Sequence, residues 1–152
     1  MFVFVSEAVR PVCLPTRSDV GDSFLGQSTT AVGWGKLSDA SFGSSRFPNV
    51  VRDRKVIANA DCRAFWGGVI IESSVCIDTA EDHAGICLDG DEGGALLVED
   101  DEGRFVQIGI TSYASHYEDY TLCEDGSPNI CTRVTPFPRL DSVRDRDFHS
   151  VN

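Results

Sequence analysis

The densest group of residues able to do chemistry lies between Gly85 and Leu96, which reads Gly-Ile-Cys-Leu-Asp-Gly-Asp-Glu-Gly-Gly-Ala-Leu. Its acids could hold a cation, because Asp89, Asp91 and Asp100 stand at the first, third and last positions of a twelve-residue window, as acids do in calcium loops. Two features argue against calcium: Gly93 occupies a ligand position, and the residues after it favour a strand. We therefore expect no metal and no cofactor here.

The cysteines and histidines give no zinc pattern either. The six cysteines include no Cys-x-x-Cys pair, and the three histidines lie far apart in sequence. Six cysteines in a chain of this size are more typical of an oxidising compartment, which predicts a secreted protein. The apolar stub 1–5 is too short for a signal-peptide core and has no basic residue before it, so we expect the chain to be incomplete.

Length and charge narrow the class of protein. The chain has 152 residues, enough for about one domain, with 41% apolar and 24% charged residues. Its 13 basic and 24 acidic residues give a net charge of −11, which would repel a phosphate backbone. No apolar run is long enough to span a membrane. We therefore expect neither nucleic acid nor membrane as a partner.

The elements that must position the 85–96 stretch are short and rich in Val, Ile and Thr, which indicates an all-β fold. The alternation in residues 50–57 places Val50, Arg52, Arg54 and Val56 on one face and is only partly amphipathic, which predicts an edge strand. Trp34, between two glycines, is expected in the core. The other predicted elements are strands 29–36, 75–77, 95–98, 104–113 and 129–134, a hairpin turn at 99–103, a helix at 62–66 capped from 59–61, and a terminal helix at 136–146.

The stretch from Gly85 to Leu96 resembles the nucleophile loop of chymotrypsin/trypsin-like serine endopeptidases, which runs Gly-Asp-Ser-Gly-Gly-Pro. Other segments resemble family motifs and stand in the same order as in the family. Their sequences are most similar to those of arthropod digestive and collagenolytic members. The similar segments are the inter-barrel linker at 10–15, the first strand of the second barrel at 31–35, the intermediate-loop disulfide region at 59–62 and 74–77, the substrate-backbone strand at 108–113 and the final strand at 128–134.

The resemblance covers about Ser6 to Val143 and implies an all-β fold: a trypsin-like Greek-key β-barrel, the second barrel of the two-barrel fold, with a short C-terminal helix. It divides the chain into the unassigned stub 1–5, a linker-like segment 6–26, the C-terminal barrel 27–146 and a tail 147–152. A chain with only this barrel would leave its inter-barrel face uncovered, which predicts self-association through that face.

The same resemblance assigns the site residues. Gly90 and Glu92 stand at the oxyanion-hole amides, and Asp91 is the acid that orders the loop; a solvated turn acid is the alternative. It implies two disulfides, Cys62–Cys76 and Cys87–Cys123. The family partner of Cys13 would lie in the missing N-terminal part, and Cys131 stands where the family has an aromatic residue. A buried free thiol is expected at Cys131, and a Cys13–Cys131 disulfide is the alternative. The residues at the family's substrate pocket are uncharged: Gly85, Ser112, Tyr113, Ala114 and Asn129.

The departures from the family bear on activity. Glu92 stands at the position of the nucleophilic Ser, and a carboxylate cannot be activated there like a serine hydroxyl. No His stands in an Ala-Ala-His-Cys context, so the general base and its orienting Asp are absent from the chain. The chain has one more residue between Cys87 and Gly90 than the family, so we expect the amides of Gly90 and Glu92 to be displaced from the oxyanion-hole positions.

Three functions remain open from the sequence. The first is a catalytically inactive homologue that binds a partner, such as a protease or a substrate protein. The second is a fragment of a serine-type endopeptidase whose N-terminal half is missing. The third is an acidic structural module.

Overall fold

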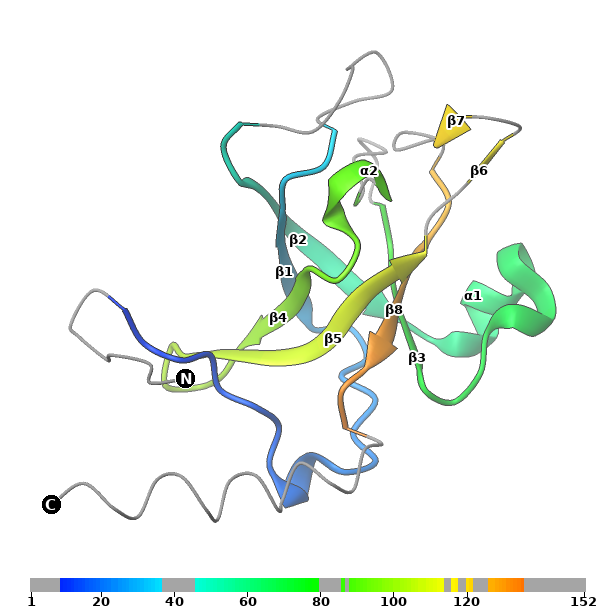
Figure 1. The fold of residues 1–152 in the computed structure, drawn as a ribbon. Helices are drawn as coiled ribbons and strands as arrows, with labels where there is room; N and C mark the ends of the chain where they lie inside the picture. Colours follow the sequence, from blue (N-terminus) through cyan, green and yellow to red (C-terminus); the bar gives the residue numbers. More distant parts are fainter. Residues whose placement is uncertain are drawn as a thin grey trace, which may run out of the picture.

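The computed structural model describes residues 9–36, 46–79, 86, 88–113, 116–117, 120–121 and 126–135. Six antiparallel strands close into a barrel in the order β1-β2-β3-β8-β5-β4 (Figure 1), so the all-β barrel expected from the sequence is confirmed. The barrel strands are β1 (Ser28–Gly33), β2 (Asn49–Ile57), β3 (Ser74–Ile77), β4 (Ala95–Glu99), β5 (Phe105–Tyr113) and β8 (Asn129–Arg133). A separate two-stranded sheet contains β6 (His116–Tyr117) and β7 (Tyr120–Thr121).

The interior of the barrel is filled by aliphatic side chains that alternate along the strands. On β1, for example, Thr29 and Ala31 face inward and are buried, while Thr30 and Val32 are partly exposed. Burial of a large aliphatic side chain stabilises a fold by roughly 1.5–3 kcal/mol, so this cluster is the main source of stability. The cluster contains Phe24, Ala31, Val56, Val75, Ile77, Ile86, Leu96, Val98, Ile108 and Cys131.

Strand β2 departs from the sequence prediction in two ways. It pairs with both β1 and β3, so it is an interior strand of the closed barrel and the predicted edge strand is wrong. The inward and outward faces of β2 also exchange within the strand. Arg52 and Arg54 pair with consecutive residues of β1, so Asp53 between them, with φ 60°, has no partner on β1. Such a bulge resets the two-residue period, and Arg54 is therefore buried while Arg52 is exposed.

Trp34 is not a core residue. Its exposed fraction is 53%, although the sequence suggested core packing. The reason is the strand period, because Gly33 and Gly35 on either side are buried and the residue between them points outward.

A short helix lies beside strand β3 and is joined to it by a disulfide. Helix α1 (Asn59–Trp66) begins three residues before the expected position, and the 3-10 turn η2 (Gly67–Val69) follows it. Its N-cap is Ala58, which makes no side-chain cap, so the expected cap is wrong. The Asn59 amide donates instead to the carbonyl oxygens of Ile71 and Ser74, at 3.1 and 3.2 Å.

The structure contains the expected Cys62–Cys76 disulfide, which ties α1 to β3 across 14 residues of sequence. A loop of this length contributes about 3 kcal/mol in the chain-entropy account of disulfide stabilisation. The second pair, Cys87–Cys123, lies outside the described residues, as does the predicted helix 136–146.

The β4–β5 hairpin turns as the sequence predicted. Gly103 adopts φ 74 in this turn, which suits glycine. The carboxylate of Asp100 accepts from the backbone N–H groups of Glu102 and Arg104, at 3.0 and 2.9 Å. Its pKa lies below the ordinary aspartate value, chiefly because the Arg104 N–H donates to it.

The N-terminal part of the described chain lies along the start of β5. Cys13 exchanges backbone hydrogen bonds with Phe105 and Gln107, at 3.1 and 2.9 Å, and the 3-10 turn η1 (Arg17–Asp19) then leads toward β1. Within the described ranges, no helix is long and apolar enough to cross a bilayer.

Candidate functional site

The stretch that resembles a nucleophile loop forms a four-residue helix, α2 (Leu88–Asp91), and the turn that leads into β4. Backbone hydrogen bonds hold the turn to β5: the Gly93 N–H donates to the Thr111 oxygen at 3.0 Å, and the Thr111 N–H donates to the Gly94 oxygen at 2.9 Å. The Trp34 N–H donates to the Gly90 oxygen at 3.4 Å. The loop is thus fastened to the ends of two barrel strands, β1 and β5.

Asp91 is buried under this loop, with 6% of its surface exposed. Its Oδ1 atom accepts from the Gly35 backbone N–H at 2.7 Å. A Cβ atom on Gly33 or Gly35 would overlap the Asp91 carboxylate, so both glycines are needed for this close approach. Asp91 is therefore not a solvated turn acid, and its carboxylate connects the loop to the end of β1.

Glu92, at the position of the family's nucleophile, points its carboxylate back along its own loop. Its Oε2 atom accepts from the Gly90 backbone N–H at 3.0 Å, and both residues are exposed to solvent. The amide expected to bind a substrate oxygen is thus already hydrogen-bonded to a side chain of the same loop.

Asn129, expected among the residues of the substrate pocket, uses its side chain within the protein. Its Oδ1 atom accepts from the Ile86 N–H at 2.8 Å, and its Nδ2 donates to the Ile86 oxygen at 3.3 Å. Asn129 is 4% exposed and Ile86 is 2% exposed. This paired contact fixes Ile86 against the first residue of β8 and leaves little of the amide for a ligand.

The other pocket residues are distributed differently. Ser112 and Tyr113 are exposed at the end of β5, and Tyr113 contacts Trp66 edge to face with ring centroids 5.2 Å apart. Gly85 and Ala114 lie outside the described residues, so the pocket as a whole is not defined by the structure. Ser112 and Tyr113 instead line a cavity of about 330 Å³ together with Val69, Ile71, Ser73, Ser74, Ile130, Cys131 and Thr132.

The structure places Cys131 in the barrel interior as a free thiol. Burial raises the pKa of this thiol to about 12, and a hydrogen bond with Thr111 opposes the shift. A thiol with so high a pKa is scarcely ionised at neutral pH, so Cys131 is unsuited to nucleophilic catalysis. Cys13 is also free, and it is partly exposed.

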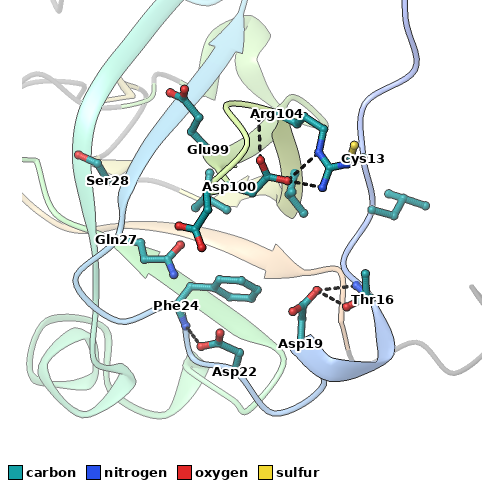
Figure 2. Close-up of a pocket in the computed structure, with 14 residues that line it drawn as sticks. Cys13, Thr16, Asp19, Asp22, Phe24, Gln27, Ser28, Glu99, Asp100 and Arg104 are labelled. Atoms are coloured by element: carbon teal, nitrogen blue, oxygen red, sulfur yellow. Dashed lines mark hydrogen bonds and ion pairs between the residues drawn. The ribbon is translucent and has the colours of Figure 1, made fainter.

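A larger cavity of about 720 Å³ lies between the N-terminal segment and the β4–β5 hairpin, with an acid-rich wall (Figure 2). Ser28 and Glu99 line it, so it opens at the far ends of β1 and β4 from the Asp91 loop. Asp19 accepts from the Thr16 N–H at 2.6 Å, and Arg104 pairs with Asp100 at 2.9 Å. The cavity is separate from the candidate site.

Among the residues that the structure describes, no three His, Cys, Asp or Glu side chains lie close enough together to hold a metal ion. The calcium-loop alternative is wrong because Ala95–Glu99 is strand β4, so the window that begins at Asp89 does not form one continuous loop.

Three contacts of the site were missed from the sequence: Asn129 with Ile86, the two glycines around Asp91, and Glu92 with Gly90. The glycine contact left a signal, since glycines two residues apart at a strand end often mark a close backbone approach. The other two left none, because side-chain direction depends on the folded backbone.

Comparison with known proteins finds relatives along most of the chain. A family model described as Trypsin matches residues 3–140. Brachyurin of Leptuca pugilator is 36% identical over 135 residues, which make up 89% of this chain and 52% of brachyurin. A venom protease of Bombus pensylvanicus is 28% identical over 141 residues, which make up 92% of this chain and 53% of that protein.

A solved structure of HL collagenase superposes with a TM-score of 0.73 at 26% identity, covering 94% of this chain and 56% of the collagenase chain. The chain therefore spans about half the length of these relatives.

Proposed function

The chain belongs to the trypsin family, and from that premise we propose that it acts by binding a protein partner and not by cleaving peptide bonds. The observation that carries the proposal is Glu92, which stands at the nucleophile position with its carboxylate on the Gly90 amide. A carboxylate at this position offers no hydroxyl for a general base to activate. Loss of the catalytic residues in such enzymes lowers the rate by about 10⁶-fold.

The buried Asn129 side chain supports the same proposal. A peptide substrate needs a pocket for the side chain next to the scissile bond, and the resemblance places Asn129 among the residues of that pocket. Its amide is engaged with both backbone groups of Ile86. An amide held in this way has one acceptor and one donor committed to Ile86, so it is less available to a substrate side chain.

The outer wall of the barrel carries a surface suited to a protein partner. Val50 lies opposite Val32, Val32 lies opposite Ala95, and Ala95 lies opposite Ile110, so one apolar row crosses β2, β1, β4 and β5. We call these four residues the outer row. The side chains at its ends are exposed, Val50 by 45% and Ile110 by 40%. Four neighbouring strands make the row about 14 Å wide, since adjacent strands lie about 4.8 Å apart.

The occupant of the outer row is, in this proposal, an apolar face of a protease, of a substrate protein or of a second copy of the chain. The proposed location is extracellular, which the Cys62–Cys76 disulfide and the similarity to a venom protease support. An acidic structural module, the third function considered, has less support, because the chain keeps a loop organised around a buried Asp91.

A second candidate is serine-type endopeptidase activity in a longer protein that includes this chain. The matched relatives are proteases about twice as long, which favours it. The carboxylate of Glu92 argues against it, because an added domain would not supply the missing hydroxyl. The 5′ end of the transcript separates the two candidates: a reading frame with an Ala-Ala-His-Cys segment would support the longer endopeptidase.

The test of the proposed function is a peptidase assay on a mixed library of fluorogenic peptides, with trypsin as the positive control. We expect no turnover by the wild-type chain and none by Glu92→Ser, because no general base accompanies the new hydroxyl. Turnover by the wild type would refute the proposal. Turnover by Glu92→Ser alone would favour the endopeptidase candidate, because it would show that the rest of the machinery is present.

A further inference from the structure

The Gly90 amide has a direction fixed by its surroundings. Gly90 adopts φ 114, and its oxygen accepts from the Trp34 N–H. A Cβ at Gly90 would lie 3.0 Å from the Trp34 oxygen and 3.1 Å from Gly35. The residue is therefore packed closely against the end of β1, and its N–H cannot turn away without a shift of that packing.

Neighbouring contacts keep the same loop in place. The Asp91 carboxylate accepts a hydrogen bond from the Gly35 N–H. The Gly94 N–H donates to the backbone oxygen of Asp91 at 2.9 Å, and the Gly93 N–H donates to the backbone oxygen of Thr111. Because the backbone is held on both sides of Glu92, the group that occupies the Gly90 N–H is chosen by the side chain at position 92 and not by refolding of the loop.

We propose that Glu92 is a built-in ligand of the Gly90 amide, which keeps external carboxylates off this loop. A carboxylate oxygen at 3.0 Å already shows the chemistry that the amide accepts. Because Glu92 lies two residues from Gly90, its carboxylate is present at a high effective concentration and outcompetes a dilute ligand. Its removal exposes a preorganised donor for the carboxylate of a peptide. The proposal rests on the proposed function, in which this loop binds and does not catalyse.

The test compares wild type, Glu92→Ala and Glu92→Gln by the backbone amide signal of Gly90 in ¹⁵N-labelled protein. Sodium acetate is the probe, titrated at constant ionic strength against sodium chloride. The alanine variant removes both the acceptor and the charge. The glutamine variant removes only the charge and keeps an oxygen that can accept from Gly90, so it separates occupancy from charge repulsion.

We expect acetate to move the Gly90 signal of Glu92→Ala about threefold to tenfold further than that of wild type or Glu92→Gln, the effect of about one hydrogen bond. An equal response in all three proteins, or none in any, would overturn the proposal. A response of Glu92→Gln as large as that of Glu92→Ala would also overturn it, because repulsion alone would then explain the wild type.

Amide hydrogen exchange at Gly90 provides a second measurement, which needs only the wild type and Glu92→Gln should Glu92→Ala not fold. Exchange at Gly90 that is slower, in both proteins, than the rate of an unstructured peptide of the same local sequence supports the contact; exchange at the unstructured rate in both contradicts it. The amide signal does not report hydrolysis, so peptidase activity would refute the proposed function and leave this contact standing.

Discussion

Replacing Asn129 with alanine tests how strongly its side chain holds Ile86 in place. The change removes two hydrogen bonds, at 2.8 and 3.3 Å, from the backbone N–H and oxygen of Ile86. Ile86 is only 2% exposed, so neither group can reach water without local opening. An unsatisfied buried polar group costs about 1–3 kcal/mol, so the two together cost about 2–6 kcal/mol.

Urea denaturation followed by circular dichroism measures this loss. With a slope of about 2 kcal/mol per molar urea, the midpoint of Asn129→Ala should fall by roughly 1–3 M at an unchanged slope. The matched control is Asn59→Ala, which also removes an amide from two hydrogen bonds, at 3.1 and 3.2 Å, in a less buried place. We expect it to lose about 1 kcal/mol or less. Equal losses in the two variants would show that the Ile86 contact is not specially stabilising, and the reasoning would be refuted.

Three further predictions concern the disulfide, the buried thiol and the outer row. Replacing Cys62 and Cys76 together with alanine should lower the free energy of unfolding by about 3 kcal/mol in urea titrations; an unchanged midpoint would contradict this. Cys131, with a pKa of about 12, should resist iodoacetamide at pH 8 in the folded protein and react after unfolding, as read by peptide mass spectrometry; reaction in the native state at the rate of the unfolded chain would contradict its burial. The wild-type chain should self-associate in analytical ultracentrifugation, whereas Ile110→Lys should shift it toward monomer and the control Arg52→Lys should not; a monomeric wild type would rule out self-association.

The sequence predicted the fold well where local rules act alone. The six barrel strands were expected within a few residues of their bounds, whereas β6 and β7 were not expected. Gly103 was identified from the need for a left-handed turn. The Cys62–Cys76 pair came from family resemblance and not from spacing, because spacing alone leaves the pairing of six cysteines open.

Tertiary contacts decided the errors. The skipped residue Asp53 depends on how β1 pairs with β2, and no local pattern marked it, so both the faces and the edge position of β2 were misjudged. Trp34 was assigned to the core by its size, whereas its exposure follows from the buried glycines beside it. A hydrophobic side chain is placed by strand period first and by its preference for burial second.

The site was predictable only as a set of positions. The sequence placed Asp91 and Glu92 in one glycine-rich loop, because they are neighbours in the chain. It could not show that one carboxylate is buried against Gly35 and the other turned back to Gly90, since those directions depend on the end of β1. The Asn129 contact joins residues 43 apart in sequence and was equally hidden.

The central claim, that this trypsin-family chain does not carry out serine-type catalysis, is tested most directly by intact-mass spectrometry after exposure to a fluorophosphonate probe. Such a probe forms a stable bond with an activated serine, and active trypsin treated in parallel provides the control. We expect an unchanged mass for the folded chain, because Glu92 occupies the nucleophile position and the Gly90 amide is already bound. A stoichiometric adduct on any serine of the folded chain, lost on prior unfolding, would contradict it.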